Sequence, residues 1–268
     1  MTHKRLFALL IALLPVFVSS CSDDDDDDLI GNWVRTSDFD GLARGEASCF
    51  SIGNKGYLVC GYDGSKSNAR LSDLWEYDMT TDAWTQKASF PGTARSNATA
   101  FAIDGKGYFG TGYDGENKLN DFWEYDPATN TWTQKADFPG VGRYSAVSFG
   151  VSGKGYIGAG YDGNYLKDFY SFDPANNTWT QIISIGGSKR MGASSFVIDN
   201  IAYVCGGVNN GEYISDFWKF DPSTGQWTQL RDIANTSDED YDDDYSIVRM
   251  NASTFVIDGA AYLTCGES

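Results

Sequence analysis

The stretch KGYFGTGYDGENKLNDFWEYDP, residues 106–127, decides the fold because near copies of it recur along the chain. Its first half returns as KGYLVCGYDG and KGYIGAGYDG, and its second half as LSDLWEYD and LKDFYSFDP. The tryptophans that follow the copies are 48, 47 and 48 residues apart: Trp84, Trp132, Trp179 and Trp227. A period of about 50 residues is typical of a propeller or a solenoid.

One copy contains the pattern of four strands. Residues 97–103 form a small-and-apolar strand a, and residues 104–107, Asp-Gly-Lys-Gly, form a turn into strand b at residues 108–112. After a loop, residues 121–126 alternate as strand c, and residues 131–135 form strand d. Four antiparallel strands per repeat correspond to one propeller blade, so we expect almost no helix.

These residues resemble the kelch repeat, in which a hydrophobic strand ends in glycine and an aromatic-rich segment such as DFWEYDPATNTW follows. The double glycine of that repeat occurs here only as Gly206-Gly207, and its first position otherwise holds Cys60, Thr111, Ala159 or Cys265. The resemblance covers residues 32–268. It implies an all-β, kelch-type β-propeller of four-stranded antiparallel blades.

The two ends of this region predict an incomplete ring. Residues 32–35, Asn-Trp-Val-Arg, resemble a strand d without its own a, b and c, which in closed kelch propellers completes the last blade. The sequence stops at Ser268, after four full blades and strands a and b of a fifth. We expect a truncated form, an open or strained arc, of a propeller with five or six blades, and favour six.

Residues 1–20 have the pattern of a signal peptide, with Lys4 and Arg5 before an apolar run that ends at Val18. That run is shorter than a membrane span needs. Residues 18–21, Val-Ser-Ser-Cys, resemble the lipobox of bacterial lipoproteins, which implies a lipid on Cys21. The alternative is an ordinary signal peptide followed by a chance cysteine.

Residues 21–31 form an acidic segment with six consecutive aspartates, which is too charged to fold. It is either a solvated tether or an export tag, since it resembles the signal that sends lipoproteins to the cell surface in the Bacteroidetes. We favour the export tag. The expected location is therefore the outer membrane, with exposure at the cell surface and membrane contact through the lipid alone.

Charge and histidine content exclude several functions. The net charge is −17, but removing the acids of residues 23–28 and 238–244 and the two signal-peptide bases leaves 25 acidic and 18 basic residues. No basic stripe for nucleic acid remains. The only histidine, His3, lies in the signal peptide. Histidine-based triads and imidazole metal sites, including the copper site of galactose oxidase, are excluded, and we expect no cofactor and no metal.

The geometry of a blade predicts the binding face. The d-to-a and b-to-c connections leave a four-stranded blade at the same end, so the arginine before each strand a shares this end with the Tyr-Asp-Gly after strand b. The interpretation is a polar pocket for a sugar, an anionic sugar or an acidic peptide. The alternative is that each arginine joins neighbouring blades. The candidate residues are Arg44, Arg95, Arg143, Arg190, Arg249, Tyr113, Asp114, Tyr161 and Asp162.

The fourth repeat departs from the pattern. It has Val-Asn-Asn-Gly at residues 208–211 in place of Tyr-Asp-Gly, and an acidic insertion at residues 238–244 follows it. Asn209, Asn210 and the insertion are therefore candidates for ligand specificity. Calcium in the insertion is a weaker hypothesis than solvation, because the Gly-punctuated spacing of a calcium loop is absent.

Two further sets of residues, one aromatic and one of cysteines, each allow two interpretations. Phe122, Trp123 and Tyr125 resemble a carbohydrate platform, although alternation favours burial between adjacent blades. Cys49 and Cys60 are predicted to lie opposite each other across the turn at residues 53–56. A disulfide is possible there in an exported protein, although directly paired cross-strand cysteines are often too strained to close.

Together these features favour a monomeric, lipid-anchored surface module that recognises a glycan or protein ligand through the arginine-bearing face, without catalysis. The alternative is a sugar-modifying enzyme resembling the kelch-fold sialate mutarotases, with groups such as Glu46 in acid–base roles. A third hypothesis is a scaffold or adhesin without a small ligand.

Overall fold

The structure, a computed structural model, describes residues 34–65, 69–234 and 247–268. The chain divides into two units, residues 1–36 and residues 37–268. The expected signal peptide, Cys21, the acidic tether and the insertion at residues 238–244 lie outside the described residues. Every strand of the described residues belongs to the second unit, residues 37–268.

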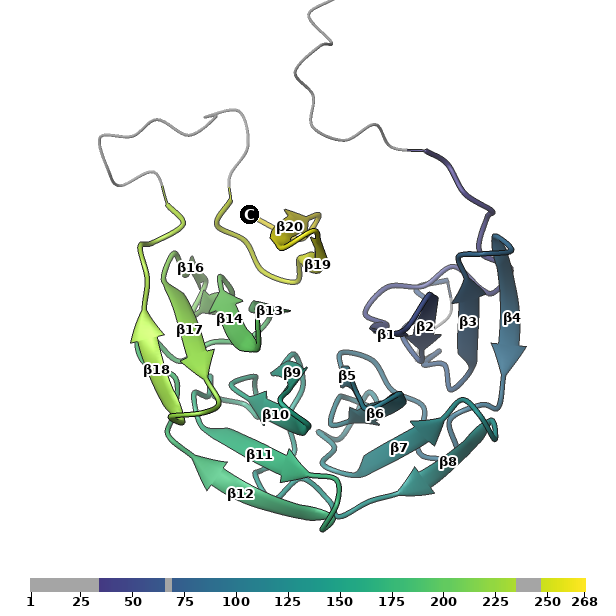
Figure 1. The fold of residues 1–268 in the computed structure, drawn as a ribbon, viewed down its shortest axis with the longest axis horizontal. Coiled ribbons are helices and arrows are strands. Elements are labelled where there is room, and N and C mark those ends of the chain that lie inside the picture. Colours follow the sequence, from purple (N-terminus) through teal and green to yellow (C-terminus); the bar gives the residue numbers. More distant parts are fainter. Residues whose placement is uncertain (1–33, 66–68, 235–246) are drawn as a thin grey trace, which may run out of the picture. The chain divides into compact units, whose positions relative to one another are not determined.

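This unit is all-β, and the described residues contain no helix and thus none that could cross a membrane (Figure 1). We number its main sheets blades 1 to 5. Blade 1 contains β1 (Ser48–Ile52), β2 (Lys55–Val59), β3 (Leu74–Asp78) and β4 (Ala83–Lys87). Blade 2 contains β5 (Thr99–Ile103), β6 (Lys106–Gly110), β7 (Phe122–Asp126) and β8 (Thr131–Gln134). Blade 3 contains β9 (Val147–Val151), β10 (Lys154–Gly158), β11 (Phe169–Asp173) and β12 (Thr178–Ile182).

Blade 4 contains β13 (Ser194–Ile198), β14 (Ile201–Cys205), β17 (Phe217–Asp221) and β18 (Gln226–Gln229). Between its second and third strands, β15 (Val208–Asn209) and β16 (Glu212–Tyr213) form a small separate hairpin. Blade 5 consists of β19 (Ser253–Ile257) and β20 (Ala260–Thr264). The four full blades and the two-stranded fifth sheet agree with the prediction from the repeats.

The first strands of successive blades lie side by side: β1 contacts β5, β5 contacts β9, β9 contacts β13, and β13 contacts β19. The remaining strands of each blade extend outward from them (Figure 1). This radial arrangement confirms the propeller architecture.

The hairpin between the first two strands of a blade has a two-residue turn, whereas the sequence predicts a turn of four residues. Ile103 pairs with Lys106, so only Asp104 and Gly105 form the turn, with φ of 48° and 76°. Two successive left-handed residues are the requirement of a type I′ turn, whose twist matches the flanking strands.

The same shift changes the cysteine pairing. Cys49 lies opposite Leu58 instead of Cys60, because the turn in blade 1 is Gly53-Asn54. Cys49 is exposed, Cys60 is buried, and both thiols are free. The prediction that Cys49 lies directly opposite Cys60 is therefore wrong, by two residues.

The glycine in the recurring Lys-Gly-Tyr segment allows adjacent blades to approach closely. A Cβ added to Gly107 would lie 2.3 Å from the ring of Phe50 in blade 1, and one added to Gly155 would lie 2.3 Å from Phe101 in blade 2. A larger residue would push the blades apart.

The aromatic residues of the third strands form the core between blades, as alternation predicted. Phe122 and Tyr125 are fully buried. Phe122 lies 4.9 Å, ring centre to ring centre, from both Phe172 and Trp179 of blade 3. They are therefore core residues, not an exposed carbohydrate platform.

In blades 2, 3 and 4 the tryptophan of the fourth strand also joins two blades. The indole N–H of Trp132 donates to the carbonyl of Ala88 at 2.9 Å, and that of Trp179 donates to Ala136 at 2.9 Å. Both acceptors lie just after the last strand of the preceding blade. A single repeated residue thus packs within its own blade and bonds to its neighbour.

A buried carboxylate lies in blade 2 away from any candidate site. Glu124 accepts hydrogen bonds from Lys106 at 2.7 Å and from Tyr108 at 2.9 Å, and Lys135 lies 3.3 Å away. Burial opposes ionisation of Glu124, but these partners outweigh it and hold its pKa below the ordinary 4.5. Burial and the hydrogen bond to Glu124 raise the pKa of Tyr108.

We predict that Glu124→Gln destabilises the protein at pH 7 and that the difference from wild type shrinks in acid. A carboxylate whose folded pKa is depressed contributes stability above its unfolded pKa, and this stability is lost as pH falls through the folded pKa. Urea denaturation at pH 7 and at about pH 3 measures the difference. Glu116→Gln, at an exposed position, is the control, and a pH-independent difference for Glu124→Gln would contradict the prediction.

Candidate functional site

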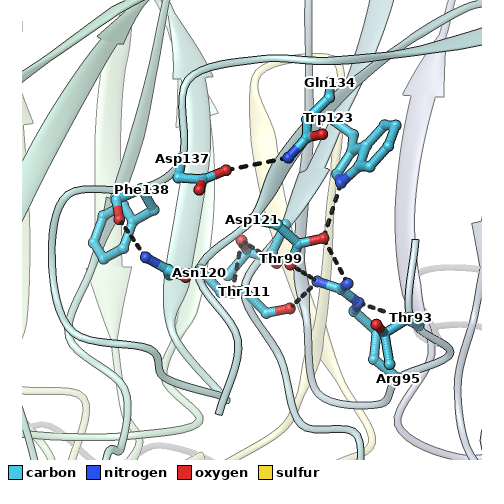
Figure 2. Close-up of polar contacts among 11 residues, drawn as sticks. Thr93, Arg95, Thr99, Thr111, Asn120, Asp121, Trp123, Gln134, Asp137 and Phe138 are labelled. Carbon is cyan, nitrogen blue, oxygen red and sulfur yellow. Dashed lines mark hydrogen bonds and ion pairs between the residues drawn. The ribbon is translucent and has the colours of Figure 1, made fainter. Parts of the chain in front are cut away.

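The arginines predicted to line a pocket lie inside the blades. Both terminal nitrogens of Arg95 donate to the Asp121 carboxylate, at 2.5 and 2.7 Å, and one of them also donates to the carbonyl of Thr111 at 2.9 Å (Figure 2). The indole of Trp123 donates to the same carboxylate at 2.9 Å. Asp121 immediately precedes the third strand, so the side chain of Arg95 ties the loop before its blade to the loop between β6 and β7.

The same arrangement recurs in the other full blades. Arg143 pairs with Asp168 at 2.7 and 2.9 Å, and the side chains of Arg95, Arg143 and Arg190 are fully buried. The remaining pairs are Arg44 with Asp73 and Arg190 with Asp216. Burial opposes ionisation of Asp73, but hydrogen bonds from Arg44 and Trp75 keep its pKa below the ordinary value.

The arginine backbone makes a second connection. The N–H of Gly61 in blade 1 donates to the carbonyl of Arg95 at 2.9 Å, and the N–H of Gly112 in blade 2 donates to that of Arg143 at 2.7 Å. Arg95 and Arg143 therefore each hold their own blade through the side chain and the preceding blade through the carbonyl, and the carbonyl of Arg190 accepts the equivalent bond from Gly160. This placement supports the structural alternative, so Arg44, Arg95, Arg143 and Arg190 are not candidates for ligand contact.

Arg249, before blade 5, repeats part of this pattern. One terminal nitrogen donates to the carbonyl of Cys265 at 2.6 Å, which is the position of Thr111 in blade 2. Its side chain is held by the blade that follows it, like those of the other arginines.

An open ring of four backbone hydrogen bonds lies around the axis at the end of the blades that carries these loops, which we call the loop face. Asn97 donates to Glu46 at 2.9 Å, Ser145 to Asn97 at 2.9 Å, Gly192 to Ser145 at 2.9 Å, and Asn251 to Gly192 at 2.7 Å, all between main-chain N–H and carbonyl groups. Each ring residue lies two positions after an arginine. The same bond thus links all five blades.

All five ring residues have left-handed backbone, with φ between 49° and 66°. They line a cavity of about 540 Å³ together with Glu267. We call these six residues the channel mouth: Glu46, Asn97, Ser145, Gly192, Asn251 and Glu267. The first strands below it carry mostly small side chains, such as Ala100, Ser148 and Ser195, and Cys49 lies in that wall.

Only Glu46 among the channel-mouth residues was predicted from the sequence. A signal was present, because the position two residues after each arginine changes identity from repeat to repeat while the arginine does not.

A second feature of the loop face is a band of aromatic rings. Tyr113 lies 5.4 Å from Tyr144, which lies 5.6 Å from Tyr161, which lies 5.1 Å from Tyr165, measured between ring centres. At the other end the guanidinium of Arg70 lies over the rings of Tyr62 and Tyr113, at 5.3 and 4.9 Å. The tyrosine band, as we call it, consists of Tyr62, Arg70, Tyr113, Tyr144, Tyr161 and Tyr165.

Every member of the tyrosine band is half-buried, so its rings are held in place while part of each remains exposed. Tyr113 and Tyr161 were candidates from the sequence, whereas Arg70, Tyr144 and Tyr165 were not. Their repeats do not share these residue types, which is why the repeat pattern did not reveal them.

The two candidate aspartates shape their own loops. Asp114 accepts hydrogen bonds from the backbone N–H groups of Glu116 and Asn117 at 2.8 and 2.6 Å, and Asp162 accepts one from Asn164 at 2.8 Å. Burial opposes ionisation of Asp114, but these bonds and the charge of Arg70 hold its pKa below the ordinary value. Both carboxylates therefore order the loops that present the tyrosines.

The remaining candidates, Asn209 and Asn210, meet Tyr161 at a small cavity of about 210 Å³. This side pocket lies between the loop that follows β10 and the β15–β16 hairpin. Its lining residues are Tyr161, Gly163, Asn164, Tyr165, Lys189, Asn209 and Asn210. Within the described parts of the chain, no cluster of three or more histidine, cysteine or acidic side chains could hold a metal ion.

Residues 34–189 match the family described as the KLHDC2/KLHL20/DRC7 Kelch-repeats domain. The chain belongs to this kelch-repeat family. Residues 189–232 of the kelch domain also match the Kelch motif. A search of curated proteins found no significant match.

Among solved structures, the kelch domain is similar to one titled "Structure of YjhT". The TM-score is 0.61 at 20% sequence identity, over 72% of this chain and 67% of that chain. At this identity the similarity shows a shared fold only. A kelch propeller is compatible with a binding module and with an enzyme.

Proposed function

We propose that this kelch domain is a binding module that recognises a glycan or protein ligand through its loop face. The proposal depends on the channel mouth. Five blades place the same left-handed backbone at the same point of the ring, and the residues there are glutamate, asparagine, serine, glycine and asparagine. A uniform frame that carries different polar groups is suited to specific recognition, because the frame positions the groups and the groups select the ligand.

The tyrosine band and the side pocket extend the same face. Half-buried tyrosines supply contact area with little loss of side-chain freedom, and asparagines supply both donors and acceptors. Both features suit a ligand rich in hydroxyl or amide groups.

The test uses the intact protein against a glycan array and against preparations of cell-surface proteins. A ligand bound by the wild type should bind at least about tenfold more weakly to Glu46→Gln and to Asn97→Asp, since each removes one hydrogen-bonding or charged group from the channel mouth. Aspartate tolerates the left-handed φ of Asn97, so the backbone is retained. Glu116→Gln, an exposed change outside the cavity, is the control. Binding to no glycan and no protein would contradict the proposal.

We propose further that the domain is held at the outer surface of the cell by a lipid on Cys21. The support is the Val-Ser-Ser-Cys segment and the acidic run that follows it. Metabolic labelling with a fatty acid should label the wild type and not Cys21→Ala. Protease added to intact cells should degrade the wild type, and full protection would contradict surface exposure.

One observation favours a second candidate, a sugar-modifying enzyme. Glu46 and Glu267 line the same cavity, and two carboxylates at one site can act as general acid and general base. Exchange of the anomers of sialic acid, followed by NMR, tests this candidate. Acceleration that is lost in both Glu46→Gln and Glu267→Gln would support it, and exchange at the uncatalysed rate would exclude that reaction.

A further inference from the structure

The side pocket is separate from the channel mouth. The two cavities share no lining residue, and the side pocket lies off the axis, between blade 3 and the β15–β16 hairpin of blade 4. Blade 4 is the full blade that lacks Tyr-Asp-Gly after its second strand. The change of sequence in that blade thus coincides with a cavity.

The hairpin brings amide groups to the cavity. Val208 pairs with Tyr213 and Asn209 with Glu212, so the turn is Asn210-Gly211, with φ of 51° and 84°. These are the angles of a type I′ turn, and they hold Asn210 at the tip. Asn164 lines the opposite side, from the loop after β10. Amides on two sides can donate to and accept from the hydroxyl groups of a sugar ring.

The aromatic part of the pocket is preorganised. The rings of Tyr161 and Tyr165 meet edge to face, with 69° between their planes. Tyr144 supports Tyr161 from within the tyrosine band, at 5.6 Å. Exposed parts of such rings can pack against the C–H groups of a sugar, and the supporting contacts limit the entropy lost on binding.

The charge of the pocket is positive. Lys189 lies in its lining and is exposed, and none of the lining residues is acidic. The structure gives Lys189 no ion pair among the described residues. Asp162, which follows the lining residue Tyr161 in the chain, accepts hydrogen bonds from Asn164 in its own turn. An ammonium group without a bound carboxylate at the cavity favours an anionic ligand.

We propose that the side pocket is a subsite for one carboxylated sugar residue of a larger glycan. Tyr161 and Tyr165 pack against the sugar ring, the asparagines bind its hydroxyl groups, and Lys189 binds its carboxylate. A cavity of about 210 Å³ is suited to one ring and is small for a folded peptide segment. This proposal rests on the proposed function, in the case where the ligand is a glycan. It specifies the class of sugar that binds at a site away from the axis.

The experiment compares two oligosaccharides that differ only in one residue, glucuronic acid against glucose, by titration calorimetry with the intact protein. The wild type should bind the acidic oligosaccharide about tenfold more tightly. Lys189→Met should reduce binding of the acidic form to the level of the neutral form and leave the neutral form unchanged. Tyr165→Ala should weaken both. Lys167→Met is the matched control, since Lys167 is exposed in the neighbouring loop and does not line the pocket.

Persistent preference for the acidic oligosaccharide in Lys189→Met would overturn the subsite, as would equal binding of the two oligosaccharides by the wild type. Either result leaves the proposed binding function standing if other glycans bind and the channel-mouth variants weaken them. Circular dichroism of Tyr165→Ala separates lost contact from lost folding, and retained binding of both oligosaccharides by the folded variant would also overturn the subsite.

Discussion

Replacing Arg143 with alanine is expected to lower the free energy of unfolding by about 3–5 kcal/mol. The Arg143 side chain is fully buried and holds Asp168 through two hydrogen bonds. Its removal leaves the carboxylate, and the carbonyl of Ala159 to which it also donates, without this partner. Urea denaturation of the wild type and the variant measures the loss.

Two further variants show whether Arg143 acts through its planar shape and its burial. Arg143→Lys keeps the charge but cannot form two parallel bonds with Asp168, so we expect a smaller loss that remains measurable. Lys118→Ala, at an exposed position of the same face, should stay within about 0.5 kcal/mol of wild type. A loss below about 1 kcal/mol for Arg143→Ala would contradict the structural role and reopen the ligand-binding interpretation of the arginines.

Replacing Phe122 with alanine is expected to cost a similar amount, about 3–5 kcal/mol. Phe122 is fully buried between blades 2 and 3, where its ring contacts Phe172 and Trp179. The substitution removes apolar contact area and leaves a cavity at the junction of two blades. Thermal or urea denaturation monitored by tryptophan fluorescence measures the effect, because Trp179 lies in the same cluster.

The control for Phe122 distinguishes cavity formation from a general effect of substitution. Phe122→Leu retains most of the volume and should cost less than half as much as alanine. Val141→Ala, at a position that is 53% exposed, should change the stability by no more than about 0.5 kcal/mol. If Phe122→Ala were as mild as Val141→Ala, the blades would be held together by something other than their aromatic interfaces.

The repeats predicted the strands well because burial in a blade follows simple alternation. Thr99–Ile103 and Phe122–Asp126 lie within one or two residues of their expected bounds. The hairpin register could not be predicted as well. Gly53 and Gly56 both suit a turn, and a four-residue turn over residues 53–56 would move the partner of Cys49 two residues from its observed place.

The placement of the arginines shows where a sequence pattern becomes ambiguous. Blade geometry correctly put Arg95 at the loop face, yet an arginine there can point toward solvent or into the blade. The sequence does contain a sign that the arginines point into the blades, because an aspartate follows each of the first four arginines by 25 to 29 residues. These aspartates are the ion-pair partners: Asp73, Asp121, Asp168 and Asp216. The channel mouth is visible in the repeats as the variable position two residues after each arginine. The side pocket depends on residue types that the repeats do not share, so a comparison of the copies does not predict it.

The left-handed backbone of the channel mouth limits how this protein can diversify. Positive φ is costly for valine, isoleucine and threonine, and it is tolerated best by glycine, asparagine and aspartate. Ser145 and Glu46 show that other unbranched side chains are accepted there. Natural variants and laboratory libraries that acquire new ligands should therefore use only a few small or polar residue types at the five left-handed positions. So few residue types at five positions make an exhaustive combinatorial search feasible.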